Sequence, residues 1–113
     1  LESTTPERFY HGFVLGLLIR EHTTYTIKSN RESGYGRYDI CMYPNKGTLP
    51  GIVNEFKVQN ENADETTLSD TADKALQQIA QKDYASDLKS AGIENILEYG
   101  FAFAGKKVLI RKK

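Results

Sequence analysis

The sequence predicts a single α/β domain with the element order αβββαββ. Two segments, 7–22 and 72–91, repeat apolar residues at the three- and four-residue spacing of helices that face a core. The region 24–58 holds three alternating segments separated by Gly and Pro, and the region 96–110 is rich in aromatic and β-branched residues, as strands are. With 113 residues, the chain can bury one core but is too short for two ordinary domains.

The composition is that of a folded domain, with 39% hydrophobic and 27% charged residues. The single cysteine, Cys41, excludes an internal disulfide and a cysteine-based structural zinc site, so we expect a reducing, cytoplasmic location. The longest apolar run, 13–19, is far shorter than the roughly 20 residues of a transmembrane helix. We therefore expect no membrane span.

The net charge is zero, with 15 basic and 15 acidic residues, so the chain as a whole does not attract nucleic acid. Any such affinity has to come from local patches, and Lys28, Arg31 and Arg37 are the candidates for nucleic-acid binding. The alternative is that these three are ordinary solvated charges.

The first helix is expected over residues 7–22. Pro6 suits the first helical turn, and a preceding threonine can cap it. Gly12 and Gly16 lie four residues apart, which would destabilise an exposed helix. We therefore expect this stripe to be buried and to pack closely against a neighbouring backbone.

Three strands are expected next, at 24–31, 37–43 and 51–58, and their order predicts a meander. Glycines mark the turn between the first two, and Pro, Asn and Gly mark the turn between the second and third.

A polar, acidic loop is expected over 60–68, followed by an amphipathic helix over 72–91 that Gly92 ends. Strands at 96–103 and 108–110, joined by a glycine turn, then complete the sheet.

The pattern that bears chemistry is Asp39 upstream of Glu55-Phe56-Lys57. Residues i and i+2 of a strand share a face, so Glu55 and Lys57 project together while Ile52 and Phe56 face the core. If the second and third strands form an antiparallel hairpin, Asp39 approaches Glu55 from the neighbouring strand. Two converging carboxylates suit Mg²⁺, and a lysine beside them can orient water and stabilise charge on a phosphate. The pattern therefore predicts a phosphoryl-chemistry site.

Other interpretations of the charged residues stay open. Glu55 and Lys57 can form a surface ion pair on an edge strand. The tripeptide Asp87-Leu88-Lys89 has the same acid-x-Lys spacing, but it lies in a predicted helix, where side chains two residues apart diverge. Cys41 shares the face of Asp39, but no histidine is placed to activate it, and small buried cysteines are common.

Three stretches carry a resemblance to a known family: ERFYHGFVLGLL at 7–18, SNRESGYGRYDI at 29–40 and EFK at 55–57. They look like the nuclease-like domain found at the C-terminus of AAA-ATPase-like bacterial and archaeal proteins, which belongs to the PD-(D/E)XK superfamily. The similarity covers nearly the whole chain, including the run 75–79 with Tyr84.

The resemblance implies a restriction-endonuclease-like αβββαβ core with a mixed central sheet flanked by helices. It implies that Asp39 and Glu55 bind Mg²⁺, or Mn²⁺ in its place, and that Lys57 assists the attacking water. The expected activity is then hydrolysis of phosphodiester bonds in nucleic acid, with DNA as the expected substrate. The alternative is a non-catalytic module that binds nucleic acid or regulates an attached ATPase domain, and divalent-metal binding would separate the two.

The resemblance also names four supporting candidates. A glutamate of the first helix completes the metal site in several members, and Glu7 or His11 could take that place here. The alternatives are a helix-dipole role for Glu7 and a half-buried histidine at position 11. Gln78 resembles a glutamine that some members place near the site, and Tyr84 follows six residues later; the alternative is simple packing along the helix.

The chain begins with Leu1 in a polar stretch, as if cut from a longer protein. With the resemblance, this predicts that residues 1–113 form one nuclease-like domain that follows an N-terminal ATPase-like domain. Many related nucleases form homodimers, so the resemblance leaves both a monomer and a homodimer open.

Overall fold

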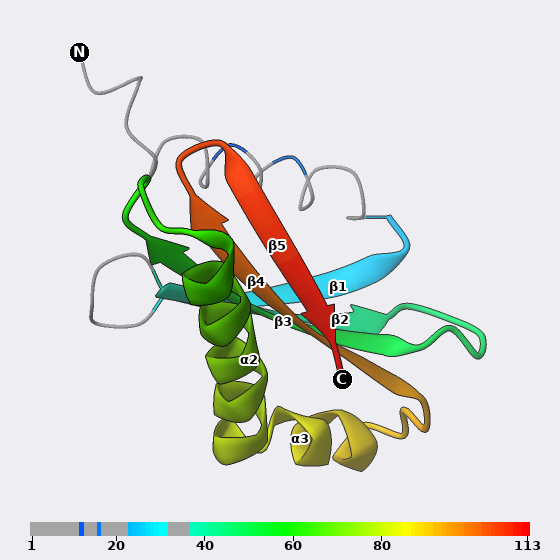
Figure 1. The fold of residues 1–113 in the computed structure, drawn as a ribbon. Coiled ribbons are helices and arrows are strands. Elements are labelled where there is room, and N and C mark those ends of the chain that lie inside the picture. The colour runs from blue at the N-terminus through cyan, green and yellow to red at the C-terminus, as the bar shows by residue number, and fades with distance from the viewer. Residues whose placement is uncertain (1–11, 13–15, 17–22, 32–36) are drawn as a thin grey trace.

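The computed structural model describes residues 12, 16, 23–31 and 37–113, and these contain a five-stranded sheet with two helices against one of its faces (Figure 1). The order across the sheet is β1-β2-β3-β4-β5, which places β3 in the centre. The strands are β1 (Tyr25–Arg31), β2 (Arg37–Pro44), β3 (Gly51–Gln59), β4 (Ile96–Ala104) and β5 (Lys107–Lys112).

The sheet is mixed. The pairs β1–β2, β2–β3 and β4–β5 are antiparallel, whereas β3 and β4 are parallel and are connected through the helices α2 (Glu65–Lys82) and α3 (Tyr84–Ser90). A parallel pair requires a long crossover of this kind. The predicted α/β class, the meander of the first three strands and the closing strand pair are confirmed.

Helix α2 begins earlier than the sequence pattern suggests, so the expected loop over 60–68 is wrong in its second half. Asp64 is the N-cap, and its Oδ1 accepts a hydrogen bond of 2.8 Å from the backbone N–H of Thr67. This bond satisfies one of the amide groups that a helix start leaves without an internal partner. Leu68 is already buried, so the apolar stripe begins in the first turn.

The single helix expected over 72–91 is also wrong, because the chain breaks at Asp83. Asp83 has φ +57°, and its N–H bonds to the carbonyls of Ile79 (3.1 Å) and Ala80 (3.2 Å). The left-handed conformation ends α2 and redirects the chain into α3, at a cost of about 1 kcal/mol for a residue with a Cβ. Gly92, with φ +88°, follows α3 where a stop was expected.

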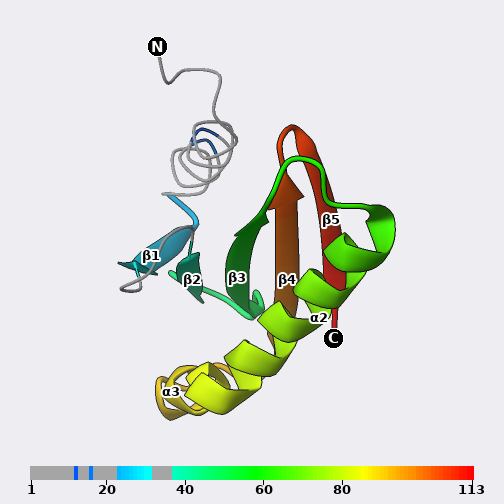
Figure 2. The same ribbon diagram turned by 60° about the vertical axis from the view of Figure 1, so that its left-hand side comes forward.

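Helix α2 lies close to the sheet because small residues meet there. Ala72 and Ala75 are fully buried against β4. A Cβ added at Gly100 would lie 2.4 Å from the carbonyl oxygen of Ala72, so only glycine fits this position of β4. Figure 2 shows α2 lying along the sheet beside β4 and β5.

Most of the predicted first helix, over 7–22, lies outside the described residues. Gly12 and Gly16 are helical and exposed, and a Cβ added at either would meet no atom within 4 Å. The close packing expected of this pair is therefore wrong. Within the described part of the chain, no helix is long and apolar enough to cross a membrane.

Candidate active site

Two carboxylates face each other from neighbouring strands at the middle of the sheet. Asp39 of β2 lies directly opposite Glu55 of β3 in the antiparallel register. Asp39 is 1% exposed and Glu55 is 0% exposed. Removing carboxylates from water is costly unless a cation accompanies them, so this pairing identifies a site for positive charge.

Lys82, the last residue of α2, supplies positive charge to both carboxylates. Its Nζ lies 2.9 Å from Oδ2 of Asp39 and 3.5 Å from Oε1 of Glu55. The sequence interpretation did not single out this residue. A signal was present, because Lys82 follows Ile79 by three residues and so continues the buried stripe that runs through Ala72 and Ala75.

Tyr84 lies at the start of α3, beyond the break at Asp83, and its side chain reaches the same carboxylate. Its hydroxyl donates a 2.5 Å hydrogen bond to Oδ2 of Asp39. Nζ of Lys82 lies 5.8 Å from the centroid of the Tyr84 ring. The left-handed turn at Asp83 therefore delivers two side chains, one on each side of it, to one carboxylate.

Burial works against both members of the Asp39–Lys82 ion pair. It raises the pKa of the Asp39 carboxyl, and the hydrogen bond from Tyr84 opposes that rise. Burial also lowers the pKa of the Lys82 ammonium. Each charge is thus disfavoured by desolvation and favoured by its partner, as in other buried ion pairs.

Lys57 lies on the same strand and the same face as Glu55, two residues further along. In the register it stands opposite Ala102 of β4 and Arg37 of β2, and it is half-buried. The alternative of a surface ion pair on an edge strand is wrong, because β3 is the central strand and Glu55 is fully buried. The prediction that Ile52 and Phe56 face the core is confirmed, and Glu55 is buried as well, on the opposite face of β3.

The other predicted site residues are placed to different degrees. Gln78 lies one turn before Lys82 on α2, and its buried Oε1 accepts no hydrogen bond within the described region. Lys28 is exposed on β1, with Nζ 4.6 Å from the ring centroid of Tyr43. Arg31 and Arg37 are strand residues whose side chains lie outside the description, and Glu7 and His11 lie outside the described residues altogether.

The donor set fits a magnesium-type ion. Among residues 23–31 and 37–113, no group of three or more His, Cys, Asp or Glu side chains is arranged to hold a metal. Asp39 and Glu55 instead offer two buried carboxylates from opposed positions. Magnesium is commonly held by one or two carboxylates, with water and phosphate oxygens completing its shell.

The two other sequence patterns that could suggest a site, Cys41 and Asp87-Leu88-Lys89, do not form one. Cys41 is a buried free thiol, and burial, reinforced by the charge of Asp39, raises its pKa to about 12, so the reactive thiolate is strongly disfavoured. Asp87 and Lys89 are exposed on α3, on either side of the buried Leu88.

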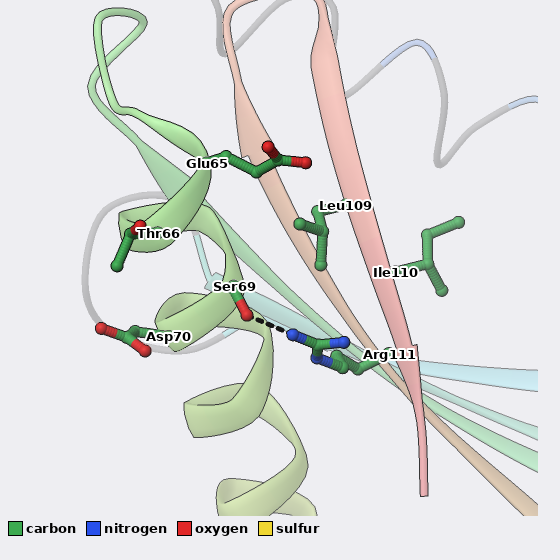
Figure 3. A pocket seen from close by; sticks show the side chains of 7 residues that line it. All are labelled: Glu65, Thr66, Ser69, Asp70, Leu109, Ile110 and Arg111. Atoms are coloured by element: carbon green, nitrogen blue, oxygen red, sulfur yellow. Dashed lines mark hydrogen bonds between the residues drawn. The ribbon is translucent and has the colours of Figure 1, made fainter.

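A concave region lies at the opposite end of α2 from Lys82, between the first turns of the helix and β5 (Figure 3). Its volume is about 440 Å³. Arg111 projects into it and donates to Ser69 and to Asp73, the latter at 3.1 Å. The guanidinium group of Arg111 is thus already paired within the protein. The lining residues are Glu65, Thr66, Ser69, Asp70, Leu109, Ile110 and Arg111.

The chain is similar to a known protein family. A family model described as the PD-(D/E)XK nuclease superfamily matches residues 5–113. No curated protein and no solved structure matches the chain. The match covers β1 to β5 and both helices, so it includes both carboxylates and the lysines near them.

Proposed function

The chain belongs to the PD-(D/E)XK nuclease superfamily, and on that basis we propose that it is a metal-dependent nuclease that hydrolyses phosphodiester bonds of DNA. The observation that carries the proposal is the pairing of Asp39 with Glu55, buried at the centre of the sheet, with Lys57 on the same face. A buried acidic pair at this position is costly for the fold, which favours a functional reason for it.

In the proposed site, Asp39 and Glu55 hold the metal ion. Nucleases of this superfamily generally use divalent metals, and the all-oxygen donor set favours Mg²⁺, with Mn²⁺ as a substitute. The bound ion would polarise a phosphate and make a water molecule more acidic. The two carboxylates are held in a fixed relative position because both lie on paired strands and not on loops.

Lys57 and Tyr84 have different roles in this proposal. The Lys57 ammonium orients the attacking water and stabilises negative charge that develops on the phosphate oxygens. Tyr84 does not act on the substrate. Its hydroxyl fixes the Asp39 carboxylate through the 2.5 Å hydrogen bond.

Because the chain has no net charge, the attraction of nucleic acid to the site has to come from local positive charge. Lys28 is exposed on β1, and in the register it lies opposite Cys41, on the same face of the sheet as Asp39. A lysine in this position can contact the phosphate backbone of a nucleic acid without reading its bases.

The test is cleavage of linear, circular, single-stranded and branched DNA, and of RNA, in the presence of Mg²⁺ or Mn²⁺. We expect DNA cleavage that requires the ion and that falls by at least about a hundredfold in both Asp39→Asn and Lys57→Ala. Asp87→Asn and Lys89→Ala are matched controls, since they carry the same acid-x-Lys spacing on exposed positions of α3. They should cleave like the wild type.

Metal binding without cleavage of any substrate would contradict the nuclease proposal and favour a non-catalytic module that binds nucleic acid or regulates an attached ATPase domain. Cleavage of RNA alone would overturn the choice of DNA. Cleavage that survives Asp39→Asn would show that this carboxylate pair is not the active site.

A further inference from the structure

We propose that Lys82 is a resident counter-ion that holds Asp39 and Glu55 together in the metal-free protein and leaves them when a divalent ion binds. The inference rests on the proposed function, because it takes these two carboxylates to be the metal ligands. It makes Lys82 a positioning residue whose charge sets how readily the site loads.

The ammonium group of Lys82 lies between the two carboxylates. Lys82 Nζ contacts one oxygen of each carboxylate, at 2.9 Å from Asp39 and 3.5 Å from Glu55. An ion held by the same two carboxylates would occupy the space between them, where Lys82 Nζ lies in this structure. An ammonium and a metal ion cannot share that space, so Lys82 has to leave it.

The burial of the three groups shows which of them can move. The side chains of Asp39 and Glu55 are 2% and 0% exposed, and each is fixed on a strand of the central sheet. The Lys82 side chain is 21% exposed. Lysine has a long flexible stem that can carry its ammonium group out to water while the stem stays packed.

The backbone around Lys82 has no need to move during this exchange. The N–H of Asp83 bonds to the carbonyls of Ile79 and Ala80 and fixes the end of α2. The Tyr84 hydroxyl donates its own hydrogen bond to Oδ2 of Asp39, and this bond can orient the carboxylate after the lysine leaves. The exchange is therefore a side-chain rotation on a fixed frame.

Exchange of one cation for another has two measurable consequences. In the metal-free protein, removing the lysine charge leaves two buried carboxylates without this partner, which destabilises the fold. In the metal-bound protein the same removal is harmless or favourable, because the ion no longer has to displace a competing charge. Stability and metal affinity should thus change in opposite directions.

The experiment compares wild type, Lys82→Met and Lys74→Met by titration calorimetry with Mn²⁺ and Mg²⁺ alone, and by thermal unfolding with and without the ions. Lys74 lies on the exposed side of the same helix and is the matched control. For Lys82→Met we expect Kd to fall about tenfold, which corresponds to the loss of one competing charge interaction. We also expect the metal-free Tm to fall by about 10 °C and saturating metal to restore most of it.

A second measurement uses the unaltered protein. Reductive methylation followed by mass spectrometry should modify Lys82 slowly in the metal-free state and faster in saturating Mg²⁺, with Lys74 as the internal reference. If Lys82→Met does not fold without metal, Lys82→Gln removes the charge and keeps a hydrogen-bond donor, and the same gain in affinity is expected.

Equal or weaker metal binding by both Lys82 variants would overturn the inference, as would Lys82 labelling that metal leaves unchanged. These readouts do not depend on cleavage. A protein that binds metal but cuts nothing would refute the proposed function and still test the inference, whereas an active nuclease with no affinity gain in Lys82→Met would refute the inference alone. Absence of metal binding by the wild type would overturn both.

Discussion

Glu55 and Phe56 are neighbours on the central strand and are both 0% exposed, yet they lie in two different environments. Glu55 faces α2 and meets Lys82, whereas Phe56 faces the opposite side and packs on Phe101, with ring centroids 4.7 Å apart. The same degree of burial therefore accompanies an ionic cluster on one face and an aromatic core on the other.

The aromatic face is built mainly from large apolar side chains. Phe101 and Phe103 stack with centroids 6.3 Å apart. Asn54, the buried amide on this side, donates to the sulfur of Met42 at 3.5 Å. The outer part of the face is hollowed by a cavity of about 430 Å³ whose lining is mostly apolar, namely Tyr25, Met42, Ile52, Asn54, Tyr99, Phe101 and Ile110.

The helix face is built from small side chains beside charged ones. Gly100, Ala102 and Ala104 of β4 are buried and let α2 approach the sheet closely. That approach is what allows the end of α2 to bring Lys82 to the carboxylates. The difference between the faces indicates that the aromatic side supplies stability and that the helix side uses part of that stability to bury charge.

The largest expected effect on stability comes from the aromatic face. Phe103→Ala should lower the free energy of unfolding by about 3–5 kcal/mol, because it removes a fully buried ring and leaves a cavity. Urea denaturation measures the loss, and Val108→Ala is the control, since Val108 stands opposite Phe103 in the register but is 37% exposed. If the aromatic face supplies stability and the helix face holds the carboxylates, folded Phe103→Ala binds metal like the wild type. A loss of metal affinity in the folded variant would contradict this division between the two faces.

The next effect belongs to the helix face. Tyr84→Phe removes the hydrogen bond to Asp39 and should cost about 1.5–3 kcal/mol, the range for hydrogen bonds to charged groups. That bond lowers the pKa of Asp39, so without it the carboxyl protonates at a higher pH. Metal affinity should then decline on acidification from a higher pH than in the wild type.

The control for Tyr84→Phe is Tyr99→Phe, which makes the same chemical change beside the aromatic core. It should leave the pH dependence of metal binding unchanged. Calorimetric titrations between pH 4 and pH 7 would measure both variants, and identical profiles in all three proteins would show that Tyr84 does not tune Asp39.

Much of this arrangement could be predicted from the sequence. The strand bounds follow from alternation and turn residues, and the cross-strand meeting of Asp39 and Glu55 follows from the short turn that makes β2 and β3 antiparallel. The burial of Glu55 could not be predicted in the same way. It depends on the parallel pairing of β3 with β4, whose first residues lie more than 40 positions away, and on the helix between them.

Lys82, the site residue that the sequence interpretation did not single out, was missed for a similar reason. The break at Asp83 has neither the glycine nor the proline that usually marks a helix end, so local propensity favours one long helix. With an unbroken helix, Lys82 and Tyr84 would diverge, since residues two apart do not share a helix face. The left-handed turn lets α3 pack, through Leu88, on Val53 and Cys41, a tertiary contact that local propensity does not capture.

The smallest expected effect tests whether the two ends of α2 act independently. Asp64→Ala removes the N-cap contact with Thr67 and should lower Tm slightly, by less than Tyr84→Phe does. The backbone N–H of Thr67 lowers the pKa of Asp64, so the cap stabilises the fold above the ordinary value of 3.8 and is lost as pH falls through the lowered pKa. The difference in Tm between wild type and Asp64→Ala should therefore be full at pH 7 and vanish in strong acid. Because Lys82 lies at the far end of the helix, Asp64→Ala should bind metal like the wild type. Weaker metal binding by this variant would mean that the whole of α2, and not its last turn alone, is needed to hold the carboxylates.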